Sequence, residues 1–189
     1  MEYNELLMKR RSVRAYLDKP VPTELLKEII KESTCAPSSG NNQPWRFVIV
    51  NNTAKMKRIS DESKKNLLSR IEADPAIYIK RYEQALRNED YNVFYNAPSL
   101  IILAGPRDYR NLKVDCALCA AYLMNAAAAH GLGTCWVNLG SDIRDANLLG
   151  ELGITPDLAI VAPIIVGYPQ GIPPMPKREE PVFLGIIES

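Results

Sequence analysis

The residues best suited to hold an anion stand together near the start of the chain. Arg10, Arg11, Ser12 and Arg14 place three guanidinium groups and one hydroxyl within five residues. Guanidinium groups bind phosphate through paired N–H donors, and a hydroxyl adds one short donor. If the stretch is extended, Arg10, Ser12 and Arg14 share one face, because strand side chains alternate. Considered alone, such a stretch is more often a set of solvated arginines at the end of a helix.

A second candidate is the uncharged loop of residues 36–44, which is followed by Trp45. The loop offers two hydroxyls and three side-chain amides. Neutral donors and acceptors of this kind suit the edge of a heteroaromatic ring or the hydroxyls of a polyol, and they do not suit acid–base catalysis. Trp45 would add a flat apolar wall. On composition alone, a plain turn is the favoured interpretation.

Two further segments connect predicted elements and could line a site. The sequence GLGTCWVNLG, residues 131–140, begins with glycines that can end a helix and lead straight into a strand. The sequence GYP at 167–169 precedes a proline-rich loop that presents Lys177 and Arg178. Without context, the first segment is as readily a simple connector, and the second is a basic surface loop.

The cysteine and histidine side chains do not predict a catalytic or metal site. Cys116 and Cys119 have the spacing of a redox pair, but they lie inside an alanine-rich helical segment and not at its start, where a thiol pKa would be lowered. His130 is the single histidine, so neither a Ser/His/Asp triad nor a zinc set is expected. The glycine fingerprints of Rossmann and P-loop proteins are missing from the sequence.

Composition limits the class of protein. The 189 residues carry a formal net charge of +1, which argues against a nucleic-acid binder. A hydrophobic content of 47% predicts a globular chain, and we expect one domain over residues 1–189. The longest apolar run, residues 158–167, is shorter than a membrane span. With charges near the N-terminus and only four cysteines, the chain is expected to be cytoplasmic and not membrane-bound.

Apolar periodicity and turn residues predict a mixed set of elements without regular βαβ alternation, which favours an α+β fold. Thr23, Thr53 and Asp74 are the candidate helix caps. Helices are expected at residues 3–10, 23–33, 53–71, 74–86, 113–130 and 144–151. Strands are expected at residues 46–50, 100–103, 134–139 and 159–166, with a further one at 183–187. Seven alanines between residues 116 and 129 put small side chains on every face of that helix, which is typical of a central or subunit-interface helix.

In this order, the segments resemble the nitroreductase family of flavoproteins across nearly the whole chain. The matching motifs are RRSVRAY, APSSGNNQPWRFVIV, NAPSLIIL, GLGTCWV, ELGITPDLAIVAPIIVGYPQ and PPMPKRE, and residues 55–90 match least. The resemblance implies an α+β fold with a mostly antiparallel central sheet flanked by helices. It also implies an intertwined homodimer with FMN at the subunit interface. The C-terminal tail of each subunit would extend over the partner.

The resemblance implies roles for individual residues and leaves the chemistry to the flavin, with no catalytic side chain and no metal. Contacts to the flavin phosphate and ribityl chain would come from Arg10, Arg11, Ser12, Lys177 and Arg178. Of Lys177 and Arg178, Lys177 is the stronger candidate for a phosphate contact, because Glu179 stands where many members of the family have an arginine. Arg14 would approach the pyrimidine side of the ring, where a cation favours the reduced flavin.

The remaining implied contacts come from three other segments. The loop residues Pro37, Ser38, Ser39 and Asn41 would lie against the flavin of the opposite subunit. Backbone N–H groups of the segment Val137, Asn138 and Leu139 would meet the flavin ring where hydride arrives and leaves. Asn66 is the candidate for an amide contact from the middle of the chain.

The implied activity is transfer of hydride or electrons from NADH or NADPH to a small oxidised acceptor by a ping-pong mechanism. Nitroaromatics and quinones are the expected acceptors. A flavin-storage or flavin-sensing protein without useful turnover is an alternative from another class. Reductive dehalogenation on the same fold is a further alternative. The sequence leaves open the physiological acceptor and the choice between NADH and NADPH.

Overall fold

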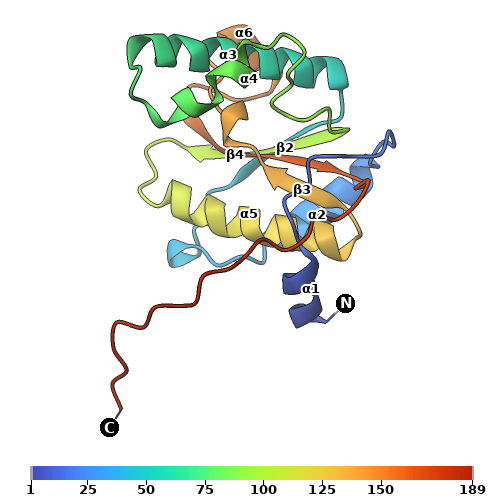
Figure 1. Cartoon of the computed structure of the whole chain (residues 1–189), viewed down its shortest axis with the longest axis vertical. Helices are drawn as coiled ribbons and strands as arrows, with labels where there is room; N and C mark the ends of the chain where they lie inside the picture. Colours follow the sequence, from blue (N-terminus) through green and yellow to red (C-terminus); the bar gives the residue numbers. More distant parts are fainter. Residues whose placement is uncertain (1, 189) are drawn as a thin grey trace.

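The computed structural model describes residues 2–188 and has a four-stranded sheet between two layers of helices (Figure 1). The strands are β1 (Arg46–Val50), β2 (Ser99–Pro106), β3 (Gly133–Trp136) and β4 (Leu158–Gly167). Their order across the sheet is β1-β2-β4-β3, and each neighbouring pair is antiparallel. The α+β fold with an antiparallel central sheet is therefore confirmed.

Helices cover both faces of the sheet. They are α1 (Tyr3–Lys9), α2 (Thr23–Ser33), α3 (Thr53–Ala73), α4 (Glu83–Arg87), α5 (Leu112–Ala129) and α6 (Ala146–Glu151), with 3-10 turns η1 (Ser39–Asn41), η2 (Tyr78–Tyr82) and η3 (Asn138–Gly140). Figure 1 shows α3, α4 and α6 on one face, α2 and α5 on the other, and α1 below the second layer.

Strand β2 joins the two halves of the core. Leu100 and Ile102 pack in one apolar cluster, and Ile101 and Leu103 pack in the other, all with 0% of their surface exposed. Successive side chains of a strand point to opposite faces, so a strand covered on both sides must be apolar throughout. The continuous apolar run at residues 100–103 is explained by this burial on both faces of the sheet.

Several sequence-based boundaries are corrected. Asp74 ends α3 and accepts from the N–H of Ala76 at 3.0 Å, so it does not begin a helix over 74–86. That stretch instead forms η2 and α4. Thr23 and Thr53 are first helical residues, and α3 is capped by Asn52, whose side chain accepts from the N–H of Lys55 at 2.8 Å. Residues 183–187 form no strand within the described chain, and their side chains are exposed.

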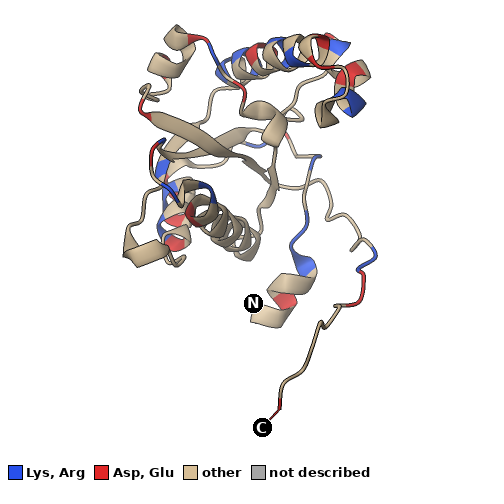
Figure 2. Ribbon diagram, turned by 90° about the vertical axis from the view of Figure 1, so that its left-hand side faces the viewer, with Lys and Arg blue, Asp and Glu red and all other residues tan. Residues whose placement is uncertain are grey.

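Helix α5 is apolar on both its buried and its exposed sides. Cys119 and Leu123 face the sheet with 0% exposure, whereas Val114 and Tyr122 are 63% and 43% exposed. Figure 2 shows most of α5 without charged residues, in contrast to the charged outer face of α3. By length and composition α5 could cross a membrane. Core helices of soluble proteins meet the same criterion, and α5 packs against the sheet and α2.

Candidate functional site

The arginine-rich segment runs extended beside β3. Ser12 forms a parallel bridge with Thr134, and the N–H of Val13 donates to the carbonyl of Thr134 at 2.9 Å. Val13 is buried, whereas Ser12 and Arg14 are exposed and Arg10 is half-buried. The predicted alternation is therefore confirmed, and it turns Ser12 and Arg14 to the side opposite Val13.

Arg11 belongs to the other side of this segment. It is 8% exposed, and its guanidinium donates to the carbonyls of Leu7, Met8 and Arg10 at the end of α1. Cationic donors at a helix C-terminus satisfy carbonyls that have no partner within the helix. The geometry thus departs from the expectation that Arg11 contacts a cofactor, because its donors are occupied by the helix end.

A cavity of about 320 Å³ opens where this segment meets the end of β3. It is lined by Arg14 and residues 135–139, here called its floor, and by Tyr78, Ile79, Tyr82 and Tyr95. The structure therefore brings Arg14 together with Val137, Asn138 and Leu139, as the sequence predicted. It does not place Arg10 there: Arg10 lines a neighbouring apolar hollow of about 400 Å³ with Thr134 and Ile172.

The floor of the cavity carries free backbone donors. Val137 donates its N–H to the carbonyl of Pro163 at 2.8 Å and is not available. Asn138 and Leu139 begin η3, and no acceptor among residues 2–188 pairs with their N–H groups. The first N–H groups of a helical turn lack partners within the turn. Two residues with unpaired N–H donors and the Arg14 cation thus line one cavity.

Gly140 holds η3 close to the core. A Cβ at this position would lie 2.3 Å from Cε1 of Phe94, whose side chain is 0% exposed. Gly140→Ala is expected to lower the free energy of unfolding by roughly 1–3 kcal/mol and to displace η3, since packed cores tolerate extra atoms poorly. Denaturant unfolding measures this effect.

Gly150→Ala is the matched control for that substitution. Gly150 lies in α6, and nothing lies within 4 Å of an added Cβ. Alanine there should stabilise by roughly 0.5–1 kcal/mol, because alanine favours a helix over glycine. Equal effects at positions 140 and 150 would contradict the packing argument.

Asn66 supports the floor from behind. It is 7% exposed, and its amide donates to the carbonyl of Asp142 and to the carboxylate of Glu62, both at 2.8 Å. Asp142 is the second residue after the end of η3. The geometry thus gives the Asn66 amide donor a role in positioning η3, which differs from the direct cofactor contact expected from the sequence.

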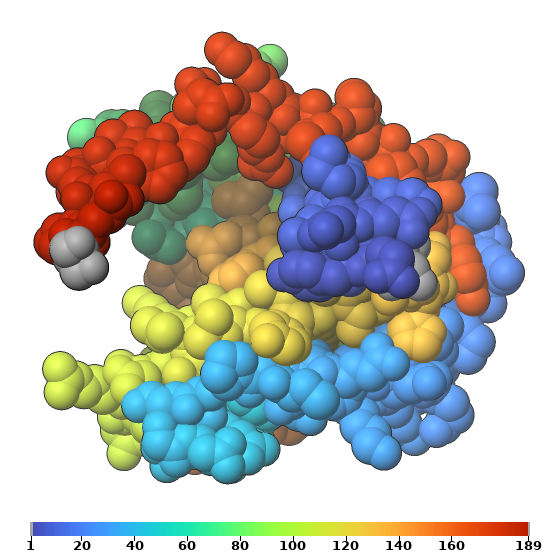
Figure 3. Space-filling view, turned by 90° about the horizontal axis from the view of Figure 1, so that it is seen from below, coloured from blue at the N-terminus to red at the C-terminus, as the bar shows by residue number. Residues whose placement is uncertain are grey.

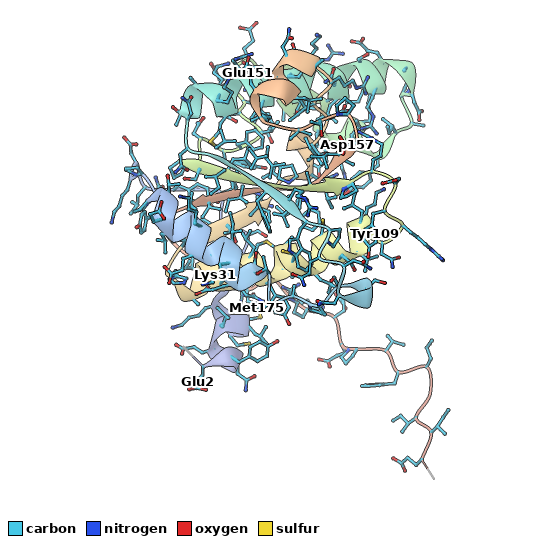
Figure 4. All side chains as sticks on the ribbon, turned by 180° about the vertical axis from the view of Figure 1, so that it is seen from behind. Glu2, Lys31, Tyr109, Glu151, Asp157 and Met175 are labelled. Atoms are coloured by element: carbon cyan, nitrogen blue, oxygen red, sulfur yellow. The ribbon has the colours of Figure 1, made fainter. Side chains whose placement is uncertain are left out.

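The loop of residues 36–44 is held rigidly, but it lies away from the cavity. The N–H of Ser39 donates to both carboxylate oxygens of Asp115, at 3.2 and 3.3 Å, and the Tyr109 hydroxyl donates to the same carboxylate at 2.8 Å. Figure 4 labels Tyr109 near the start of α5. Gly40 and Asn41 have φ values of 57° and 55°. This left-handed backbone gives the loop a fixed, unusual shape.

The predicted contacts on this loop and on the tail are not brought to the cavity of their own chain. Pro37, Ser39 and Asn41 are exposed, Ser38 is half-buried, and Lys177 and Arg178 are exposed on the extended tail. The lining residues include none of them. A role of the loop at the site of another subunit stays a prediction.

Asp115 is expected to fix the loop shape. Asp115→Ala should destabilise the protein by roughly 1.5–3 kcal/mol, since the Ser39 N–H and the Tyr109 hydroxyl lose a charged acceptor. The stability of Asp115→Asn should lie between that of the wild type and that of Asp115→Ala, because asparagine keeps one side-chain oxygen as an acceptor. Limited proteolysis in the loop and thermal unfolding measure the change. Asp108→Ala, at an exposed position nearby, is the control, and the prediction is wrong if the two alanine variants behave alike.

The remaining candidates are structural. Burial raises the pKa of the Cys116 thiol to about 12 and also raises that of Cys119, so both are protonated at neutral pH. His130 lies 3.0 Å from the carboxylate of Glu32 at the surface. Sequence reasoning missed the tyrosines that line the cavity, although their density in residues 78–95 was a signal.

Comparison with known proteins identifies the family of this chain. The profile described as the nitroreductase family matches residues 7–168. The chain belongs to the nitroreductase family. A nitroreductase with bound FMN from Bacteroides fragilis has the same fold, with a TM-score of 0.83, 26% sequence identity and 100% of both chains covered.

Two curated relatives differ in their named activity. A putative NADH dehydrogenase/NAD(P)H nitroreductase of Archaeoglobus fulgidus is 25% identical to this nitroreductase-family chain over 171 residues, covering 88% of this chain and 84% of the relative. Iodotyrosine deiodinase 1 of Rattus norvegicus is 47% identical over 49 residues, covering 26% of this chain and 17% of the relative.

Proposed function

We propose that the protein is an FMN-dependent oxidoreductase. It would transfer hydride or electrons from NADH or NADPH to an oxidised nitroaromatic or quinone by a ping-pong mechanism. The observation that carries the proposal is the cavity floor, where the Arg14 cation and the free N–H groups of Asn138 and Leu139 come together. The FMN-bound relative of known structure and the NAD(P)H nitroreductase relative support it.

The residues present fit FMN. The donors of the floor match the carbonyl and nitrogen acceptors along one edge of a flavin ring, and Arg10, Ser12 and Lys177 or Arg178 would hold the phosphate. When bound, FMN supplies a ring that can take up and release two electrons. Arg14 would stabilise the negative charge of the reduced ring, and the backbone donors would orient the ring without competing for its proton.

We also propose a homodimer with the site at its interface. The exposed side of α5 carries Val114, Leu118 and Tyr122, and an apolar face of this kind is typical of an obligate interface. Figure 3 shows the C-terminal segment as an arm that projects from the body. Leu184 and Ile187 on this arm are fully exposed, so a partner surface would bury them. The loop of residues 36–44 would then reach the partner's cavity.

One alternative is supported by a specific relative. The deiodinase match favours reductive removal of a halide from a phenol as a second candidate activity, although it covers only a quarter of the chain. Flavin storage without turnover is the other alternative. The cytoplasmic location and the single domain expected from the sequence stay predictions.

Half-reactions separate these functions. Purified protein loaded with FMN is mixed anaerobically with NADH or NADPH, and the flavin absorbance is followed. We expect rapid bleaching, and then recovery when nitrobenzene or a quinone is added. A flavin that neither NADH nor NADPH bleaches would instead indicate storage. Recovery with an iodinated phenol, but not with nitrobenzene or a quinone, would indicate dehalogenation.

A further inference from the structure

Three tyrosines line the cavity beside Arg14 and residues 137–139, and together they are called the tyrosine wall. Tyr78 and Tyr82 come from η2, and Tyr95 comes from the turn after α4. The rings of Tyr78 and Tyr82 meet edge to face, with centroids 6.5 Å apart and an interplanar angle of 66°. The Arg14 guanidinium lies 5.7 Å from the centre of the Tyr95 ring, so the floor and the wall are in contact.

The chain that leads to Tyr95 is anchored to α3 by buried polar groups. The ammonium of Lys64, only 8% exposed, donates to the carbonyls of Asn88 and Tyr91 at 2.7 and 2.8 Å. The buried Ser60 hydroxyl accepts from the N–H of Val93 at 3.0 Å. A buried lysine is stabilised only where its donors are satisfied. These bonds tie residues 88–93, the chain that leads to Tyr95, to α3.

Tyr78 stands at the mouth of the cavity with a polarised hydroxyl. Its oxygen accepts from the Arg81 guanidinium at 2.7 Å, and this hydrogen bond lowers the pKa of Tyr78. Arg81 also lies 4.7 Å from the centre of the same ring. Because the Tyr78 oxygen accepts a hydrogen bond from a cation, the O–H group of Tyr78 becomes a stronger hydrogen-bond donor. Tyr78 is 70% exposed and therefore accessible to an incoming molecule.

We propose that this tyrosine wall is the binding subsite for the oxidised acceptor, and that the Tyr78 hydroxyl, held by Arg81, donates a hydrogen bond to an oxygen of that acceptor. The inference rests on the proposed function, because the acceptor must lie beside the flavin. The matching chemical class is a planar aromatic or quinonoid ring with an oxygen at its edge. Aromatic walls bind such rings through offset or edge-to-face contacts, and the hydroxyl and guanidinium orient the oxygen.

Equilibrium binding tests the subsite without turnover. Benzoate, which has the planar ring and edge oxygens of nitrobenzene but is not reduced, is titrated into the oxidised FMN-loaded protein while the flavin spectrum is followed. Tyr78→Phe keeps the ring and removes the donor, so benzoate affinity should fall about 5- to 10-fold. The KM for nitrobenzene should rise by a similar factor. FMN affinity should not change.

Tyr3→Phe is the matched control, because Tyr3 is 67% exposed on α1 and does not line the cavity. Arg81→Met, which keeps the Tyr78 hydroxyl but removes its partner, should weaken benzoate binding by a smaller factor. Unchanged benzoate affinity and nitrobenzene KM in Tyr78→Phe would overturn the subsite. So would a wild-type protein whose flavin spectrum does not respond to benzoate.

Two results separate this inference from the proposed function. If Tyr78→Phe loses FMN affinity, the wall holds the cofactor and the acceptor assignment is wrong. If NAD(P)H fails to bleach the wild-type flavin while the benzoate affinity still depends on Tyr78, the oxidoreductase proposal fails and the aromatic subsite stands.

Discussion

The variant Ala121→Glu is expected to lose its partner subunit and its flavin together. Ala121 is exposed on α5, between the exposed Leu118 and Tyr122. A single chain would therefore tolerate glutamate at this position, whereas an apolar interface would have to bury an unpaired carboxylate. Such burial costs roughly 3–5 kcal/mol, which weakens association on the order of 100-fold or more. Because each cavity would need the partner's loop, FMN should be released as well.

Light scattering for mass and flavin absorbance for FMN content measure both losses. Ser69→Glu, which adds the same charge at an exposed position of α3, is the control and should change neither. Added FMN should also raise the melting temperature of the native protein, since it binds only the folded state. The prediction is contradicted if the native protein is a monomer at micromolar concentration that keeps one tightly bound FMN per chain.

Arg10→Ala is expected to remove most of the bound flavin. Arg10 follows α1 directly, on the half-exposed side of the segment that contacts β3. A phosphomonoester carries about −1.5 to −2 charge near neutral pH. Loss of one charge-assisted hydrogen bond of ~1.5–3 kcal/mol should weaken FMN binding about tenfold to over a hundredfold. Quenching of FMN fluorescence on titration measures the affinity.

Lys9→Ala provides the matched comparison, because it removes one positive charge from the neighbouring position. Lys9 is exposed and pairs with Glu5 within α1, so its loss should leave FMN affinity nearly unchanged. An Arg10→Ala protein that purifies yellow, with native FMN affinity, would refute the phosphate assignment.

The sequence by itself determined the elements whose reasons are local. Residues 46–50 and the apolar run around 100–103 form strands because alternating or continuous apolar side chains fit a covered sheet. Leu26 and Ile29, three residues apart and so on one side of a helix with 3.6 residues per turn, form the buried side of α2. The order of the motifs also gave the family. These features need no information about distant residues.

Only the tertiary structure decided which residues meet. Arg14 and Asn138 line one cavity because the N-terminal segment pairs with Thr134, and Tyr95 joins them where Lys64 anchors the chain that follows α4. The expected helix over 74–86 instead forms η2 and α4. The predicted strand at 183–187 has the composition of a strand, but a strand also needs a neighbouring edge. Hydrogen bonds between segments far apart in the chain decide which residues meet and which segments become strands. The local periodicity of the sequence does not predict these hydrogen bonds.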